Sequence, residues 1–307
     1  MQLLKDLIAI RGASGDESEI AAFVANHVKN EMNNWKVQPT ILSGDGFQDA
    51  VVLIFGKPTT AVFAHVDSIG FTVGYDNELI KIGGPRAIDG MELVGTDSQG
   101  EIETELMLIE HENGSTRLQC VNDRIIDRGT NLTFKPNFRE SDDFIQSPYM
   151  DNRLGVWVAL ELAKTLENGV LVFSTYEEHG GGSVGFLGRY LYDNFKIRQA
   201  LISDITWVTD GVTHGKGVAI SMRDQGIPRR SYLNRIISLA KKHEIDFQLE
   251  VESAGGSDGT ALQKSDVPFD WCFIGAPEDN VHTPDEKVHK FDIRAMVKLY
   301  QVLIAEL

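Results

Sequence analysis

Hydrophobic positions follow two alternating spacings along most of this chain. Short runs of β-branched and aromatic residues are typical of buried strands, whereas apolar residues that recur every three or four positions are typical of helices. The pattern predicts strands at residues 50–55, 60–66, 170–176, 200–204, 217–222 and 271–274, and helices at residues 152–167, 184–194, 231–243 and 291–307. This alternation predicts an α/β protein built around a sheet.

A further helix is predicted near the N-terminus. Ser14 and Glu17 have the spacing of a capping box, in which each side chain satisfies a free backbone N–H of the first turn. The apolar residues that follow recur at helical spacing and supply one buried face: Ile20, Phe23, Val24 and Val28.

The segment at residues 71–146 has a different pattern. Short strands are predicted at residues 79–82, 105–110, 117–121 and 131–134, separated by Gly, Asn and Asp turns, and no helical periodicity lies between them. A length of 307 residues suggests about two domains. We therefore predict a small all-β domain at residues 71–146, inserted into an α/β domain formed by residues 1–70 and 147–307.

Composition excludes several classes of protein. The 29 Lys and Arg residues against 45 Asp and Glu residues give a formal charge of −16, and no basic patch interrupts it, so a nucleic-acid partner is not expected. The chain contains no apolar run of 18 residues and no N-terminal targeting pattern, so no membrane partner is expected. Two widely separated cysteines, Cys120 and Cys272, suggest a reducing compartment, and we expect a cytoplasmic protein.

Histidine and acidic residues follow the predicted strands or precede the long central helix. In an open α/β sheet, ligands bind at the loops that follow the carboxyl ends of the strands. Taken singly, each residue also fits a solvated strand end, or a helix N-cap in the case of Asp151. Together they offer enough nitrogen and oxygen ligands for two divalent ions, with Zn²⁺, Co²⁺ or Mn²⁺ favoured over Ca²⁺. The set consists of His65, Asp67, Asp151, Glu177, Glu178, Asp204 and His282.

Two pairs within this set suggest a division of roles. His65 and Asp67 are two positions apart, so in a strand they share a face, and Asp67 could orient the ring nitrogen that does not bind a metal. Glu177 and Glu178 are adjacent carboxylates that repel each other unless a cation or a proton lies between them. Because adjacent residues face different ways, one could bind a metal while the other carries a proton.

A serine hydrolase is an alternative, because G-x-S-x-G occurs twice, around Ser183 and around Ser257. A nucleophilic serine of this type lies on a tight turn directly between a strand and a helix. Residues 177–182 already fill the turn before Ser183, and Ser257 lies five residues after the predicted strand around Glu250. Neither serine fits the required turn.

The chain resembles the dinuclear-metal aminopeptidases of the glutamyl aminopeptidase and tetrahedral (TET) aminopeptidase family, a group of co-catalytic zinc exopeptidases. The resemblance extends over nearly the whole chain. It implies a three-layer α/β/α zinc-exopeptidase-like catalytic domain with an inserted small all-β domain. The matching motifs are IRGASG at 10–15, AHVDSIGF at 64–71, DNRLG at 151–155, EE at 177–178, Asp204, GKG at 215–217, GSD at 256–258 and HTPDE at 282–286.

The resemblance implies a ligand set for two divalent metal ions in each chain. Asp151 would bridge both ions. His65 and Asp204 would complete one site, and Glu178 and His282 would complete the other. Zinc is the expected metal, with cobalt or manganese as alternatives.

The resemblance also implies the catalytic roles. Glu177 would be the general base that activates a water molecule, and Asp67 would support His65. Three positions depart from the usual family pattern: Ser68 stands where an acidic residue is common, His179 where an apolar residue is usual, and Thr283 where serine is frequent.

The expected activity is hydrolysis of N-terminal residues from peptides. The expected assembly is a homo-oligomer, dodecameric by family resemblance, formed through the β domain. Two other readings stay open at this point: a related metal-dependent amidase or deacylase, and a catalytically silent homologue that binds peptides.

Overall fold

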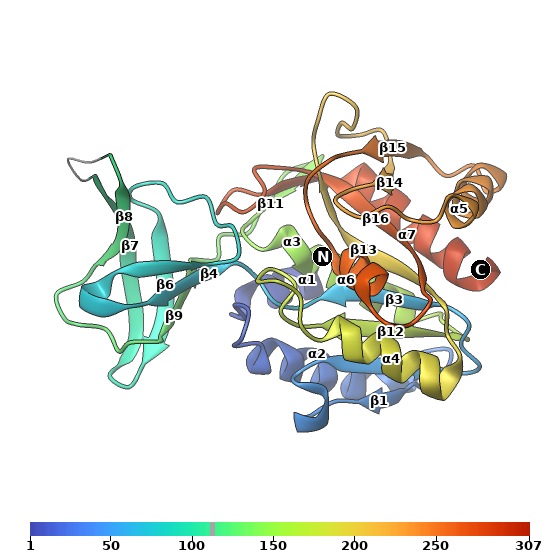
Figure 1. Cartoon of the computed structure of the whole chain (residues 1–307), viewed down its shortest axis with the longest axis horizontal. Coiled ribbons are helices and arrows are strands. Elements are labelled where there is room, and N and C mark those ends of the chain that lie inside the picture. The colour runs from blue at the N-terminus through green and yellow to red at the C-terminus, as the bar shows by residue number, and fades with distance from the viewer. Residues whose placement is uncertain (111–113) are drawn as a thin grey trace.

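The main body of the computed structural model, which describes residues 1–110 and 114–307, is an eleven-stranded mixed sheet between helices (Figure 1). Nine of its strands follow one path, and β14 and β15 pair beside β16. The strands on the path are, in spatial order, β1 (Thr40–Leu42), β2 (Val51–Phe55), β12 (Gly169–Ser174), β3 (Ala61–His65), β13 (Gln199–Trp207), β16 (Asp270–Asp279), β17 (Lys287–His289), β11 (Phe144–Gln146) and β10 (Arg139–Glu140). The remaining two are β14 (Val218–Arg223) and β15 (Phe247–Val251).

Four parallel strands form the centre of this sheet: β12, β3, β13 and β16. Their side chains alternate between two hydrophobic cores because successive strand residues point to opposite faces. In β3, for example, Val62 and Ala64 lie in one core, and Ala61 and Phe63 lie in the other. The predicted α/β class is confirmed, and the body has three layers.

Helices cover both faces of the sheet. The larger core is shared with helices α1 (Gln2–Ala9), α2 (Ser18–Glu31), α3 (Met150–Ala163), α5 (Arg230–Lys242) and α7 (Lys290–Glu306). The smaller core lies under α4 (Val184–Phe195) and α6 (Asp258–Lys264). Among residues 1–110 and 114–307, no helix is both long and apolar enough to span a bilayer.

The predicted capping box is wrong. Helix α2 begins at Ser18, and no side chain caps its first turn. The hydroxyl of Ser14 donates instead to the carboxylate of Asp67, 2.6 Å away, and Glu17 accepts a hydrogen bond from the backbone N–H of Tyr176. Both side chains are therefore used in contacts between distant parts of the chain.

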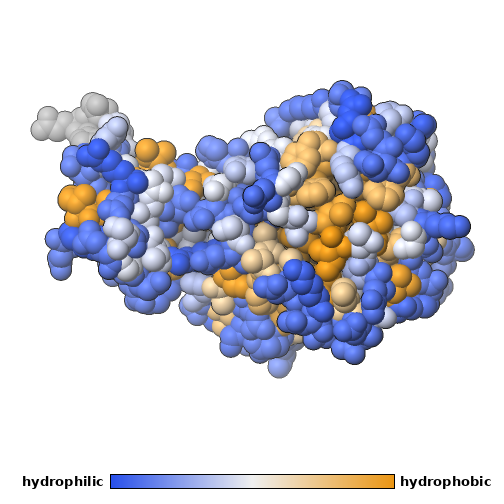
Figure 2. Space-filling model, turned by 90° about the horizontal axis from the view of Figure 1, so that it is seen from below, coloured by the Kyte–Doolittle hydropathy of each residue, from blue (hydrophilic) through white to orange (hydrophobic). Residues whose placement is uncertain are grey.

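A second sheet, with six antiparallel strands among residues 1–110 and 114–307, projects from the body (Figure 1). It has a hydrophobic core of its own, which includes Phe71, Leu106 and Phe134. In Figure 2 hydrophilic side chains cover much of this lobe, and apolar ones gather mainly over the larger lobe. The strands, in spatial order, are β5 (Leu79–Ile82), β4 (Gly70–Val73), β9 (Asn131–Phe134), β6 (Glu92–Asp97), β7 (Gly100–Glu110) and β8 (Thr116–Val121).

Two short strands inside the predicted insert belong to the large sheet. Strand β11 pairs with β17, and β10 pairs with β11. The sequence of this stretch does not distinguish the two sheets, because both use short strands separated by polar turns. The second sheet therefore ends at Phe134, before the boundary at residue 146 that we predicted.

Candidate metal centre

The predicted site residues meet at one edge of the large sheet. His65 is the last residue of β3, and Glu177 and Glu178 follow β12, its parallel neighbour. Asp204 lies within β13, on the other side of β3. Asp151 in the first turn of α3 and His282 in the loop after β16 complete the cluster. Asp151 is not the helix cap, because Tyr149 is the N-cap residue of α3 and no side chain caps this helix; the Asp151 carboxylate faces both histidines instead.

The side chains form two groups that share Asp151. On one side, His65 Nε2 lies 3.2 Å from Asp151 Oδ1 and 3.6 Å from Asp204 Oδ2. On the other side, His282 Nε2 lies 3.4 Å from Asp151 Oδ2 and 3.2 Å from Glu178 Oε2. The ligand atoms of each group all lie within 4.8 Å of one another. The two oxygens of one carboxylate thus face two different groups.

These groups fit divalent metal ions. Four tetrahedral ligands at about 2.0–2.2 Å from a zinc ion lie about 3.3–3.6 Å from each other, close to the separations between the histidine and carboxylate atoms of the two groups. Within the described residues, Glu178 Oε1 is buried without a hydrogen-bond partner, although a buried carboxylate oxygen normally has one. Metal ions bound by the two groups would also balance the negative charge that gathers here.

The protonation of the site reflects this crowding of charge. Burial, together with the negative charge of Asp151, raises the pKa of Glu178 to about 7, and burial likewise raises the pKa of Asp204 to about 7. Burial and the neighbouring carboxylate of Glu178 raise the pKa of Glu177 well above its ordinary value. Although burial opposes it, the carboxylate of Asp204 holds the pKa of His65 well above its ordinary value. A bound cation would reverse this balance, since it favours the ionised carboxylate and the neutral imidazole.

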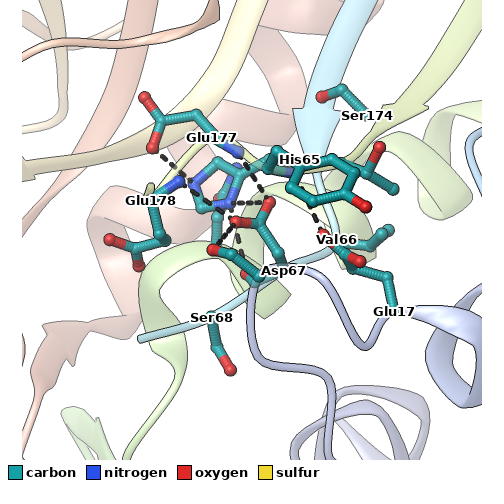
Figure 3. A network of polar contacts seen from close by, with 12 residues as sticks. Glu17, His65, Val66, Asp67, Ser68, Ser174, Glu177 and Glu178 are labelled. Atoms are coloured by element: carbon teal, nitrogen blue, oxygen red, sulfur yellow. Dashed lines mark hydrogen bonds and ion pairs between the residues drawn. The ribbon is translucent and has the colours of Figure 1, made fainter. Parts of the chain in front are cut away.

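Asp67 lies beside His65, on the side of its Nδ1 atom, and connects it to the loop after β12 (Figure 3). Its Oδ1 atom lies 3.4 Å from His65 Nδ1 and accepts the backbone N–H of Glu177 at 3.0 Å. Its Oδ2 atom accepts the N–H of Glu178 at 3.0 Å and the Ser14 hydroxyl at 2.6 Å. One fully buried carboxylate therefore positions a histidine and both glutamates. The carboxyl groups of the two glutamates point apart, as their adjacency predicts (Figure 3).

The three departures from the family pattern leave this cluster intact. The Ser68 hydroxyl donates to the carbonyl of Gly12, and its side chain points away from Asp67 (Figure 3). His179 Nδ1 accepts the N–H of Gly83, in the loop after β5. The Thr283 hydroxyl donates to a carbonyl of its own loop.

The same loop after β5 contacts one of the histidines. His282 Nδ1 lies 3.1 Å from the carbonyl oxygen of Gly84. A proton on Nδ1 donated to that carbonyl leaves Nε2, the atom that faces Asp151 and Glu178, free to bind a metal.

Sequence reasoning missed Glu286. This fully buried carboxylate accepts the backbone N–H of Asp151 at 3.2 Å and that of His282 at 2.9 Å. It therefore joins the start of α3 to the histidine loop. Its place in the HTPDE motif was the available signal, but a solvated loop glutamate has the same local pattern.

Both G-x-S-x-G serines have structural roles. The Ser183 hydroxyl accepts the N–H of Thr175 at 2.8 Å and donates to the carbonyl of the same residue. The Ser257 hydroxyl caps α6 and lies 3.3 Å from an Asp224 carboxylate oxygen, its only side-chain partner among the described residues. Neither hydroxyl is placed as an activated nucleophile.

A pocket of about 260 Å³ opens onto the cluster. Its wall includes the two histidines and Asp151, Glu177, Glu178 and Asp204. It also includes residues that the sequence did not single out, among them Trp207, Asp224, Glu250 and Glu252. A substrate held in this pocket would lie beside the cluster.

Solved structures share this fold over the full chain. An aminopeptidase from Desulfurococcus kamchatkensis matches with a TM-score of 0.85 at 21% identity, over 100% of this chain and 94% of that one. The TET1 peptidase of Pyrococcus horikoshii, described as assembling into a tetrahedron or a large octahedral shell, matches with a TM-score of 0.82 at 20% identity, over 100% and 99% of the two chains.

Sequence comparison gives the family. A protein of Acetivibrio thermocellus, whose name classes it provisionally as an aminopeptidase, is 26% identical over 330 aligned positions, which cover 97% of this chain and 96% of that protein. The sequence model of the M42 glutamyl aminopeptidases matches residues 95–299. The chain belongs to the M42 glutamyl aminopeptidase family and is a metal-dependent peptidase.

Proposed function

We propose that this protein is an aminopeptidase that hydrolyses N-terminal residues from peptides with two bound metal ions. The observation that carries the proposal is the pair of His and carboxylate groups that share Asp151, with Glu177 beside them. Membership of the M42 family supports the metal-dependent aminopeptidase activity.

Each metal ion would be held by one group. His65, Asp151 and Asp204 form the first set of ligands, and Asp151, Glu178 and His282 form the second. Mixed imidazole and carboxylate ligation favours zinc, with cobalt or manganese as alternatives. Ions bound here would polarise the scissile carbonyl and lower the pKa of a water molecule.

The remaining work falls to the chain's own side chains. The Glu177 carboxylate, whose Oε2 atom lies 3.9 Å from His65 Nε2, accepts the proton of the attacking water and returns it to the departing amine. Asp67 holds the His65 ring and the N–H groups of both glutamates, so the base and two of the ligands keep a fixed geometry. Glu286 accepts the backbone N–H groups of Asp151 and His282 and so fixes their backbone.

We also propose a division of labour between the two sheets. Residues 1–70 and 147–307 form the catalytic domain, and the inserted region at 71–146 supports oligomerisation and access of substrate. The pairing of β10 and β11 with the large sheet favours an insert that ends near Phe134. The carbonyl of Gly84, which contacts His282, gives the insert a direct connection to the site.

Assembly and location are part of the proposal. The shells described for the Pyrococcus horikoshii peptidase support a homo-oligomer for this chain, with a dodecamer as the expected form. Cys120 and Cys272 are both buried free thiols, which supports a reducing, cytoplasmic setting.

Paired substrates test the activity. Metal-loaded protein is assayed with leucine p-nitroanilide, lysine p-nitroanilide and their N-acetylated forms, and with N-acetyl amino acids. We expect hydrolysis only where the α-amine is free. Faster hydrolysis of the N-acetyl amino acids would identify a deacylase, and no turnover on a broad aminoacyl panel would identify a silent homologue.

A further inference from the structure

The pocket beside the metal centre has a second group of acidic side chains in its wall. Asp224, Glu250 and Glu252 line the pocket together with Trp207, in addition to His65 and Glu177 of the metal centre. The pocket is thus one cavity that connects the reacting centre to three further carboxylates.

Strand β13 sets the distance between Asp204, one of the proposed metal ligands, and Glu250. Asp204 and Thr206 are two positions apart on β13, so their side chains share a face. Two strand residues span about 7 Å. The Thr206 hydroxyl donates to Glu250 Oε1, so Glu250 contacts a residue that lies about 7 Å from Asp204 along the strand. A long substrate side chain can reach from the reacting centre to this carboxylate.

Within the part of the chain that the structure describes, these carboxylates have no ion pair with a basic side chain. Glu250 is only 3% exposed and Asp224 only 7%. Across residues 1–110 and 114–307, no Lys, Arg or His forms an ion pair with either of them or with Glu252. The guanidinium Nε of Arg223 donates to the backbone carbonyl of Asp224 and not to its carboxylate.

Neutral groups provide the hydrogen bonds that these carboxylates do have. Asp224 accepts the N–H of Gly226 at 2.5 Å and the Ser257 hydroxyl at 3.3 Å. Burial raises the pKa of Glu250 to about 7, as expected for a carboxylate without a cation beside it. Burying such a group is unfavourable unless a positive charge pairs with it. The pocket therefore favours a ligand that brings its own cation.

Trp207 suits the rest of such a ligand. Its side chain is 39% exposed although it lines the pocket, and its ring packs against Gly255. A flat aromatic wall contacts the methylene stem of a long side chain and attracts a cationic end group.

We propose that this acidic part of the pocket receives the side chain of a basic N-terminal residue, lysine or arginine, and that Glu250 and Asp224 pair with its charged end. The proposal rests on the aminopeptidase function and adds the substrate class. A glutamate side chain would be repelled here, and an uncharged aliphatic one would leave Glu250 buried without a cation.

Lysine and norleucine p-nitroanilides provide a matched pair, because both side chains have a four-carbon stem and only lysine has an ammonium group. With metal-loaded protein, we expect kcat/KM for the lysine substrate to exceed that for norleucine by at least about 10-fold, the effect of one charge-assisted hydrogen bond. Equal rates, or a faster norleucine substrate, would overturn the proposal and would indicate that the carboxylates bind the α-amine or nothing.

Substitutions at Glu250 and Asp224 test whether these carboxylates cause the preference for lysine over norleucine. Glu250→Gln and Asp224→Asn should each lower the ratio of lysine to norleucine kcat/KM by at least about 3-fold. Glu105→Gln, an exposed glutamate on β7, is the matched control and should leave the ratio unchanged. If Glu250→Gln does not fold, as judged by circular dichroism, Asp224→Asn still decides the question. An unchanged ratio in the folded variants would overturn the assignment.

The two levels of the proposal fail differently. Hydrolysis of norleucine but not lysine substrates would overturn the basic specificity and leave the aminopeptidase intact. No hydrolysis of any free-amine substrate by metal-loaded protein would overturn both.

Discussion

Asp67→Asn tests whether one buried carboxylate organises the metal centre. The wild-type side chain accepts the N–H groups of Glu177 and Glu178, both at 3.0 Å, and the hydroxyl of Ser14 at 2.6 Å. Asparagine keeps one oxygen and replaces the other with an NH₂ group, which can only donate. One of the two backbone N–H groups therefore loses its acceptor in a fully buried position.

The lost hydrogen bond determines how much stability and metal affinity Asp67→Asn should lose. An unsatisfied buried donor costs about 1–3 kcal/mol, so the free energy of unfolding should fall by about this amount. Groups that orient metal ligands typically contribute about 10- to 100-fold to metal affinity or activity, and zinc should bind more weakly by that factor. Urea unfolding measures the first quantity, and competition with a chromophoric chelator measures the second.

Asp266→Asn is the matched control. This carboxylate is 73% exposed and pairs with Arg189 on the surface, so its loss should change the free energy of unfolding by less than about 1 kcal/mol. If Asp67→Asn bound zinc as tightly as the wild type and unfolded at the same urea concentration, Asp67 would have no organising role.

Three further substitutions test the general base, the backbone contacts of Glu286 and the titration of Glu17. Glu177→Gln should keep its metal content, measured by atomic absorption, and lose about 10²- to 10⁴-fold in kcat because the proton acceptor is gone; a fully active variant would refute the base assignment. Glu286→Gln should weaken zinc binding by about 10-fold in a chelator competition, since one of the N–H groups of Asp151 and His282 loses its acceptor. Glu17→Gln tests pH dependence: burial raises the pKa of Glu17 to about 7, above its ordinary 4.5, so the folded state retains a proton that the unfolded state has lost. Wild-type stability should therefore fall as the pH rises from about 4.5 to 7, and Glu17→Gln should remove up to about 3 kcal/mol of that loss when urea unfolding is compared at pH 5 and pH 8. The same stability difference between the two proteins at both pH values would show that Glu17 does not titrate in this way.

Local periodicity was enough to find most elements of the large sheet and its helices. The helix predicted at 184–194 is Val184–Phe195, and the strand predicted at 170–176 is Gly169–Ser174. Each of these elements buries a whole face, so the spacing of its apolar residues indicates whether it is a helix or a strand.

Contacts between distant segments were not visible in the pattern. Ser14 and Glu17 have the spacing of a capping box, yet their side chains form hydrogen bonds with Asp67 and with the backbone of Tyr176 and do not cap the helix. Likewise, β11 pairs with β17, which lies about 140 residues further along the chain, and nothing local to Phe144–Gln146 indicates that partner.

Some residues of the candidate site can likewise be predicted from local sequence, and others cannot. His65, Asp151 and His282 were selected because histidine and acidic residues recur at strand and helix ends, and the structure brings these residues together. Glu286 accepts backbone N–H groups of other elements, and Glu250 lines a pocket whose wall comes from several elements. The local sequence around each therefore resembles that of any polar loop or strand. Their roles emerge only once the elements are assembled.

Metal analysis with reversible chelation tests whether the two His and carboxylate groups bind catalytic metal ions. We expect about two divalent ions per purified chain, loss of aminoacyl-anilide hydrolysis when they are removed, and recovery when zinc is restored. Hydrolysis that persists in fully chelated protein would contradict this expectation, as would a metal-loaded chain that hydrolyses no substrate with a free α-amine.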